Sequence, residues 1–218
     1  MDLSAINQKI KEIKRKNEPY QLQEKNTLSD PFEQFIYWFD EELHSAIYDP
    51  SAMVVASVDA NGRPDARVVL LKELEMHKFI FYTNYKSNKA KQFEKNNIIA
   101  INFYWPNYAR QVRIRGHIKK VDRSKSEEYF ATRPRETQLT THASIQSSVI
   151  ANRETLENAI KEYANQFSGT DVPCPEYWGG YEVAPIEYEF FQGRSWRMHD
   201  RLFYQLENKQ WKMTRLAP

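Results

Sequence analysis

The sequence predicts a mainly-β, antiparallel fold with flanking helices. Runs of β-branched and aromatic residues recur from residue 52 to the C-terminus, and turn residues separate several of them. Helical patterns lie before and between the groups of strands. Successive strands with helices inserted between them indicate an antiparallel barrel or sandwich. The 218 residues are enough for one domain with a sizeable core, or for two small ones.

Two helices are expected at the N-terminus. The first covers residues 3–16, where Leu3, Ile6, Ile10 and Ile13 share one stripe. A polar stretch follows, and Asp30 and Pro31 then suit the N-cap and first position of a second helix. The apolar face of that helix consists of Phe32, Phe35, Ile36 and Phe39. We therefore expect an N-terminal helix and polar arm (1–29) and a single domain (30–218).

Strands dominate the rest of the chain. The first ends at Asn61-Gly62, a strong hairpin signal, so the chain is expected to return beside it. Expected strands are residues 53–58, 66–72, 79–83, 98–105, 110–121, 181–183, 187–192, 201–206 and 210–215. In the fifth, alternation places Gln111, Arg113 and Arg115 on one face. Helices are expected at 87–95 and within 124–165.

Composition argues against several kinds of partner. The 31 basic and 29 acidic residues are mostly interspersed, so no basic face for nucleic acid is expected. A single cysteine, Cys174, allows no internal disulfide, and neither it nor the five histidines have metal-ligand spacing. No apolar run is long enough to span a membrane, and a secretory leader is not apparent. We expect a cytoplasmic protein without a metal.

Four stretches place anion-binding side chains beside strand ends or helix starts. They are residues 67–72, 82–84 with Lys89, 129–138 and 197–201. A phosphate ester carries close to two negative charges, so arginine, lysine, hydroxyl and backbone donors usually bind it. Two such clusters could hold two phosphates. Taken singly, each stretch is explained better by a solvated strand edge or a surface ion pair than by a binding site.

Taken together, these stretches resemble the pyridoxine/pyridoxamine 5′-phosphate oxidase family along nearly the whole chain. The matching pieces are residues 52–58, 67–72, 81–84, 110–112, 130–135, 146–148 and 177–181. The most specific is Glu189-Phe190-Phe191-Gln192, followed by Arg197-Met198-His199-Asp200-Arg201. The ending, residues 215–218, is also typical of the family.

The resemblance implies a split-barrel FMN-binding fold that works as a homodimer, with FMN between the subunits. The implied FMN contacts are Arg67, Val68, Val69, Leu70, Leu71, Lys72, Tyr82, Thr83, Lys89, Gln111, Gln146, Ser147, Phe191 and Arg201. The implied contacts to the substrate phosphate are Lys72, Tyr129, Arg133 and Thr137. Arg197 and His199 would bind the pyridine ring as the catalytic residues. Strict alternation places Arg67 and Lys72 on opposite faces of their strand, unless a bulge or strand end near Leu71 intervenes.

The activity implied is oxidation of pyridoxamine and pyridoxine 5′-phosphates to pyridoxal 5′-phosphate, in vitamin B6 synthesis and salvage. A hydride passes from the C4′ carbon to the flavin, and O₂ is the final acceptor, released as H₂O₂ with ammonia from the amine. The protein's task is then stacking, orientation and charge placement. We hypothesise that Arg197 positions the ring and that His199 hydrogen-bonds a substituent and assists proton movement. Alternatively, His199 pairs with Asp200 or with a backbone carbonyl.

Four features depart from the family pattern. Phe191 stands where tryptophan is usual, Thr137 where serine is common, and Asn88 where a basic residue is common. The arm reads Lys14-Arg15-Lys16-Asn17 in place of Arg-x-x-Tyr, so we assign it no substrate role. Three other functions stay open: a flavin oxidase for another ring substrate, as in phenazine pathways; a non-catalytic carrier of FMN or pyridoxal phosphate; and a nucleic-acid or partner-binding β-barrel.

Overall fold

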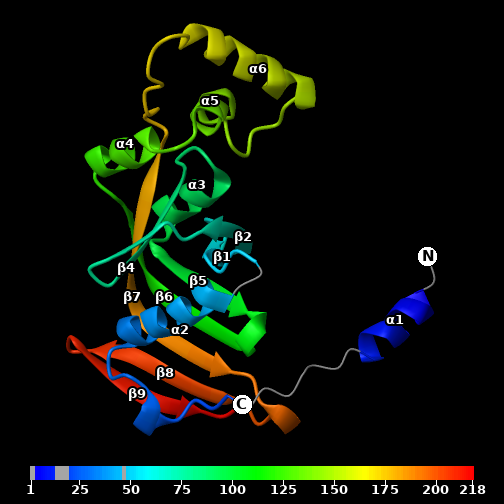
Figure 1. The fold of residues 1–218 in the computed structure, drawn as a ribbon, viewed down its shortest axis with the longest axis vertical. Coiled ribbons are helices and arrows are strands. Elements are labelled where there is room, and N and C mark those ends of the chain that lie inside the picture. The colour runs from blue at the N-terminus through cyan, green and yellow to red at the C-terminus, as the bar shows by residue number, and fades with distance from the viewer. Residues whose placement is uncertain (1–2, 13–19, 46–47) are drawn as a thin grey trace.

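The strands form one antiparallel sheet with helices on its outside, which confirms the predicted fold class. The structure is a computed structural model that describes residues 3–12, 20–45 and 48–218. In this part of the chain the strand order is β2-β1-β5-β6-β7-β4-β3, with β8 beside β7 and β9 beside β8 (Figure 1). The strands are β1 (Ala52–Val58), β2 (Pro64–Leu70), β3 (Glu73–Glu75), β4 (Lys78–Asn84), β5 (Ile98–Trp105), β6 (Arg110–Lys120), β7 (Trp178–Gln192), β8 (Asp200–Glu207) and β9 (Gln210–Leu216).

The helices surround this sheet. They are α1 (Leu3–Glu12), α2 (Pro31–Ser45), α3 (Asn88–Lys95), α4 (Arg123–Ala131), α5 (Arg135–Ala143) and α6 (Arg153–Gln166). Short 3₁₀ turns lie at Glu24–Asn26, Pro106–Tyr108 and Ser195–Arg197. Figure 1 shows α4, α5 and α6 together at one end of the molecule and α1 standing apart from the rest. Of the first predicted helix, residues 13–16 lie outside the described part.

The longest strand, β7, corrects one prediction. Residues 181–183 and 187–192 are expected from the sequence to be separate strands. Proline, which stands between them at position 185, removes a backbone donor and is uncommon inside a sheet. In the structure both belong to β7, and Pro185 lies opposite Gly116 where the register of β6 shifts. A Cβ on Gly116 would come within 2.5 Å of the Ala184 carbonyl oxygen. A bulge beside a glycine therefore lets β7 continue through the proline.

One edge of β7 pairs with two different strands along its length. Its first residues, from Trp178 to Val183, pair with β4, whereas those from Glu187 to Gln192 pair with β8. The other edge pairs with β6. As a result β7 runs from the end that carries α4 and α5 to the opposite end beside β8 (Figure 1).

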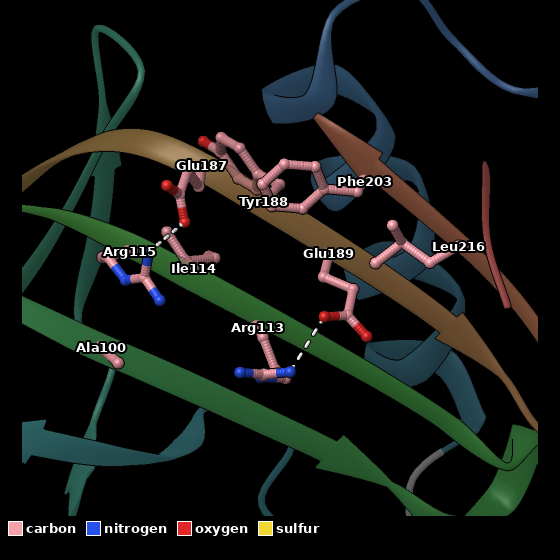
Figure 2. Close-up of a pocket in the computed structure, with 9 residues that line it drawn as sticks. All are labelled: Ala100, Arg113, Ile114, Arg115, Glu187, Tyr188, Glu189, Phe203 and Leu216. Atoms are coloured by element: carbon pink, nitrogen blue, oxygen red, sulfur yellow. Dashed lines mark hydrogen bonds and ion pairs between the residues drawn. The ribbon is translucent and has the colours of Figure 1, made fainter. Parts of the chain in front are cut away.

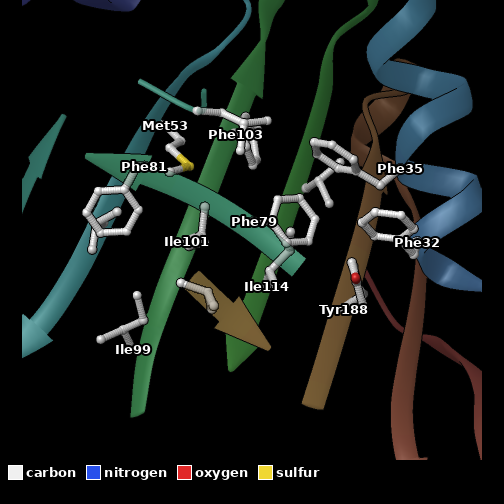
Figure 3. Close-up of a cluster of buried hydrophobic side chains, with 14 of the residues drawn as sticks. Phe32, Phe35, Met53, Phe79, Phe81, Ile99, Ile101, Phe103, Ile114 and Tyr188 are labelled. Atoms are coloured by element: carbon white, nitrogen blue, oxygen red, sulfur yellow. The ribbon is translucent and has the colours of Figure 1, made fainter. Parts of the chain in front are cut away.

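Aromatic side chains fill the core between α2 and the sheet (Figure 3). The Asp30 carboxylate accepts a hydrogen bond from the Phe32 N–H at 2.8 Å, as expected of an N-cap. Phe35 on α2 is fully buried, with its ring centroid 4.8 Å from that of Phe79 and 5.0 Å from that of Phe103. A second, smaller cluster lies beneath α4 and α5 and contains Phe130, Leu139, Val172 and Trp178.

Candidate active site

A cavity of about 400 Å³ lies where β2, β4, α3 and α4 meet. We call it the β2–β4 cavity. Its lining residues are Arg67, Val68, Val69, Leu70, Lys72, Tyr82, Thr83, Lys89, Tyr129, Arg133, Gln146 and Trp178. All except Trp178 are residues for which the sequence predicts a role in binding. The fold therefore brings together most of the predicted cofactor and phosphate ligands from five separate segments.

The end of β2 explains how Arg67 and Lys72 line the same cavity. The strand stops at Leu70, and Leu71 turns its side chain into the core with 6% of its surface exposed. The Lys72 N–H then donates to the Ile80 carbonyl oxygen at 2.9 Å. The strand end breaks the alternation that would have placed the two cations on opposite faces. The side chain of Leu71, a predicted cofactor contact, does not line the cavity.

Three cations around the cavity have no acidic partner. Within the described ranges, no carboxylate lies within ion-pair distance of Lys72, Lys89 or Arg133. Arg67 is the exception, because it pairs with Asp65 at 2.5 Å. Unpaired cations that converge on a partly enclosed space create a positive potential, which favours binding of anions.

A second cavity shows the opposite arrangement. It has a volume of about 310 Å³ and lies over β6 and β7 (Figure 2). Here Arg113 pairs with Glu189 at 2.9 Å, and Arg115 pairs with Glu187 at 2.6 Å. Because these arginines are already neutralised within the chain, this cavity should attract an anion less strongly than the β2–β4 cavity does.

Lys89 lies in the first turn of α3 and is almost fully buried, with 9% of its surface exposed. Its Nζ donates to Gln146 Oε1 at 2.8 Å and to Thr83 Oγ1 at 3.3 Å. Burial, followed by repulsion from Arg67, lowers the pKa of Lys89 to about 8. A bound anion would stabilise the charged ammonium of Lys89 and so offset both causes of the lowered pKa. The start of a helix also favours negative charge.

The loop that contains Gln146 and Ser147 packs against the same helix start. Ser147 Oγ accepts a hydrogen bond from the Asn88 N–H at 3.3 Å. Arg67 is fixed beside α3, where its guanidinium donates to Ser57 Oγ at 2.6 Å and to Gln92 Oε1 at 2.9 Å. Hydroxyl, amide and cationic donors therefore surround the first turn of α3, as a phosphate monoester requires.

Arg133 lies over an aromatic stack. Its guanidinium carbon is 4.6 Å from the Trp178 ring centroid, and its Nη1 donates to Thr141 Oγ1 at 2.8 Å. The Tyr82 ring stacks on Tyr129 at 3.9 Å and on Trp178 at 5.5 Å. Burial lowers the pKa of Arg133. An arginine side chain nevertheless stays cationic in proteins, because its ordinary pKa is far above neutral pH. The stack orients a cation toward the cavity.

Trp178 is a residue for which the sequence predicts no role. The signal that could have found it is the Tyr177-Trp178-Gly179-Gly180 stretch, because glycines beside an aromatic allow close stacking. A Cβ on Gly180 would come within 2.9 Å of the Tyr82 ring. Thr137 lies in an adjoining cavity of about 330 Å³, which Arg133, Gln146 and Trp178 also line.

The remaining predicted residues gather elsewhere, at the far end of β7. We call Gln111, Phe191, Arg197, His199 and Arg201 the loop cluster. Cross-strand pairing places Gln111 beside Phe191 and Phe191 beside Arg201. The Phe191 and His199 rings lie 4.9 Å apart. Arg201 Nε donates to Glu189 Oε1 at 2.8 Å, which holds its guanidinium against β7.

His199 makes a contact that the sequence analysis did not foresee. Its Nδ1 accepts a hydrogen bond from the Arg194 N–H at 3.0 Å. The two residues after Ser195, Trp196 and Arg197, both have left-handed backbones, with φ values of 60° and 61°. This conformation costs a residue with a side chain about 1 kcal/mol. Strain of this kind concentrates at functional loops.

The two ends of β7 lie too far apart for one ligand to reach both within one chain. Trp178 lies at the cavity, and Phe191 lies 13 residues further along the same strand. At about 3.3 Å per residue, an extended strand separates them by about 43 Å. A ligand of ordinary size can contact Trp178 and Phe191 at once only if these residues come from two chains.

Two other classes of site receive no support from the described residues. No group of three histidine, cysteine, aspartate or glutamate side chains there is arranged to hold a metal ion. Likewise, the described helices include none with the length and apolar character needed to cross a membrane.

Comparison with known families gives two matches. Residues 39–167 match the family described as pyridoxamine 5′-phosphate oxidase. Residues 178–218 match the pyridoxine 5′-phosphate oxidase C-terminal dimerisation region. The second match contains Phe191, Arg197, His199 and Arg201, whereas the first contains most of the β2–β4 cavity.

Several curated relatives are similar over most of their length. A pyridoxine/pyridoxamine 5′-phosphate oxidase of Legionella pneumophila (strain Paris) is 46% identical over 209 residues, which cover 96% of this chain and 97% of the relative. An oxidase of the same name from Leptospira biflexa is 42% identical over 197 residues, covering 90% and 93% of the two chains. A third, from Rubrobacter xylanophilus, is 46% identical over 189 residues, or 87% of each.

Solved structures share the fold. PhzG from Burkholderia lata, crystallised with tetrahydrophenazine-1-carboxylic acid, superposes with a TM-score of 0.87 at 25% identity, covering 93% of this chain and all of that one. A pyridoxamine 5′-phosphate oxidase-related, FMN-binding protein from Nostoc punctiforme has a TM-score of 0.69 at 19% identity, with 87% and 98% of the two chains covered.

Proposed function

The chain belongs to the pyridoxamine 5′-phosphate oxidase family, and from this premise we propose that it oxidises pyridoxamine and pyridoxine 5′-phosphates to pyridoxal 5′-phosphate. FMN is the proposed cofactor and O₂ the acceptor, with H₂O₂ as product and ammonia released from the amine. The observation that carries the proposal is that Lys72, Lys89 and Arg133, all without acidic partners among the described residues, line one cavity. Stacked aromatic rings line the same cavity.

The donors present fit FMN, which has a phosphate monoester, a polyol chain and a flat ring. Lys89, Arg67, Thr83 and Ser147 would hold the phosphate at the start of α3. Gln146 would serve the polyol chain as a neutral donor and acceptor. When bound, FMN supplies the chemistry that the side chains lack, since it accepts a hydride from the C4′ carbon and passes the electrons to O₂.

The other part of the cavity suits the substrate's phosphate. Lys72, Tyr129 and Arg133 contribute two positive charges and a phenol, and Thr137 lies beside Arg133 in the adjoining cavity. Arg133 is held in place by Trp178 and Thr141 before any ligand arrives. Such preorganisation lowers the entropic cost of binding the substrate in one orientation.

A homodimer completes the site, with the cavity from one subunit and the loop cluster from the other. The match of residues 178–218 to a dimerisation region supports this arrangement, and so does the length of β7. Arg197 would then orient the pyridine ring. His199 would donate from Nε2 to a ring substituent, because its Nδ1 already accepts the Arg194 N–H.

Oxidation of another ring substrate is the second candidate. The fold match to PhzG, at a TM-score of 0.87, supports this candidate. The curated relatives favour the B6 vitamers, since their identities of 42–46% exceed the 25% shared with PhzG.

An anaerobic absorbance titration tests the proposal. FMN-loaded protein is titrated with pyridoxamine 5′-phosphate, and the oxidised-flavin band is followed. We expect the band to disappear stoichiometrically and to return when air is admitted, with formation of pyridoxal 5′-phosphate. An unchanged flavin spectrum would remove this substrate and leave a different ring substrate or a carrier function.

A further inference from the structure

The loop of residues 193–199 carries both predicted catalytic side chains. The Arg197 side chain is exposed and makes no hydrogen bond or ion pair with the described residues, so the loop backbone is what sets the direction of its Cα–Cβ bond. That backbone is left-handed at both Trp196 and Arg197. Two successive residues keep this conformation only where their surroundings hold them.

Arg194 helps to fix the conformation of this loop through two contacts. Its N–H donates to His199 Nδ1 at 3.0 Å, and its guanidinium donates to Asp200 Oδ2 at 3.1 Å. Because a backbone N–H can only donate, Nδ1 must act as an acceptor. The proton of the neutral imidazole is therefore on Nε2. Arg194 therefore contacts both residues: its backbone N–H sets the tautomer of His199, and its guanidinium binds the carboxylate of Asp200.

Asp200 is itself fixed from two other segments. Its Oδ2 also accepts from the Leu22 N–H at 3.1 Å, and its Oδ1 accepts from Arg215 Nη1 at 3.0 Å. Arg215 on β9 binds Glu24 at 2.7 Å as well. The Asp200 side chain is 14% exposed. One carboxylate thus joins the loop, the segment before α2 and the last strand.

We propose that Arg194 and Asp200 are positioning residues, which hold His199 in its Nε2–H form and keep the strained loop in the conformation that presents Arg197. The inference rests on the proposed oxidase function for its catalytic meaning. The hydrogen-bond geometry that supports it belongs to the free chain.

The first test is the tautomer of His199, measured by long-range ¹H–¹⁵N correlation on the whole FMN-loaded protein at a pH where the ring is neutral. The signal is assigned by its loss in His199→Gln. We expect Nδ1 to have the shift of an unprotonated nitrogen in the wild type, and Asp200→Asn to give a mixture of the two tautomers. A proton on Nδ1 in the wild type would overturn the proposal without any variant.

The second test is a double-mutant cycle on kcat/KM for pyridoxamine 5′-phosphate. We expect Arg194→Gln and Asp200→Asn each to lower it about 10- to 100-fold, because small displacements of catalytic groups have effects of this size. The double variant should be no worse than Asp200→Asn alone, since that substitution already breaks the link to Arg194. FMN affinity should change less than about threefold.

Glu207→Gln is the matched control, because Glu207 also lies on β8 and forms an ion pair, with Lys212 at 3.7 Å, at the strand's other end. Losses that multiply in the double variant, or an equal loss in Glu207→Gln, would refute the positioning role. If the wild type itself fails to oxidise the substrate, the proposed function fails, and the tautomer measurement still decides the inference.

Discussion

The lowered pKa of Lys89 predicts that FMN binds more weakly at alkaline pH. In the free chain this pKa is about 8, against an ordinary value of 10.5, chiefly because the ammonium is buried. The phosphate of FMN is a dianion well below pH 8, so it does not titrate in this range. A bound dianion should restore the pKa to its ordinary value. Linkage then gives about 30-fold weaker binding at pH 9.5 than at pH 7.

The assay is quenching of FMN fluorescence by the apoprotein between pH 7 and pH 9.5. Lys89→Arg is the matched control, because arginine keeps its charge throughout, so its dissociation constant should vary far less. Lys89→Met should bind weakly at every pH. A flat profile for the wild type, or equal slopes for the wild type and Lys89→Arg, would refute the reasoning.

The lowered pKa of Lys89 also makes the stability of the apoprotein depend on pH. The unfolded chain binds more protons at Lys89 between pH 8 and pH 10.5 than the folded chain does. The contribution of Lys89 to the free energy of unfolding therefore rises with pH across this window. FMN binding and apoprotein stability should consequently respond to pH in opposite directions, which chemical denaturation with and without FMN can measure.

Three further predictions concern the surroundings of the site. Trp178→Leu removes the ring beneath Arg133 and should raise KM for pyridoxamine 5′-phosphate about 5- to 30-fold, whereas an unchanged KM would show that the stack does not orient the cation. Gly180→Ala places a Cβ within 2.9 Å of the Tyr82 ring and should lower the free energy of unfolding by about 1–3 kcal/mol in urea titrations; full stability would contradict the close approach. Burial raises the pKa of Glu42, whose Oε1 has no hydrogen-bond partner among the described residues, so the charged form is disfavoured and stability is lost as pH rises. Glu42→Gln should raise the melting temperature more at pH 8 than at pH 4, and an equal change at both would contradict this.

The local pattern of the sequence predicts most of the secondary structure. Alternation along β6 placed Gln111, Arg113 and Arg115 on one face, and in the structure these residues are half-buried or exposed while Val112 and Ile114 between them are buried. The pattern did not show that β7 is continuous, because the strand passes Pro185 only where a bulge faces Gly116 of another strand. Partners across a sheet are not visible in the sequence of one strand. The short β3 was missed for a similar reason, since its three residues have no period of their own.

The composition of the candidate site could be predicted, but its arrangement could not. The resemblance supplied the residues that line the β2–β4 cavity, and their roles remain predictions. It did not reveal that one chain divides them between a cavity and the distant loop cluster, which depends on the length of β7. The links through Arg194 and Asp200 were also missed, because they join residues 22, 194, 200 and 215 through the folded backbone.

Complementation between two inactive variants tests most directly whether each site combines two chains. Arg133→Met disables the cavity and Arg197→Met disables the loop cluster. When differently tagged variants are co-expressed, about half of the dimers are mixed, and each mixed dimer has one intact site and one with both lesions. We predict recovery of about a quarter of wild-type activity per subunit. If every site used the cavity and the loop of the same chain, each would keep one lesion, and no activity would return.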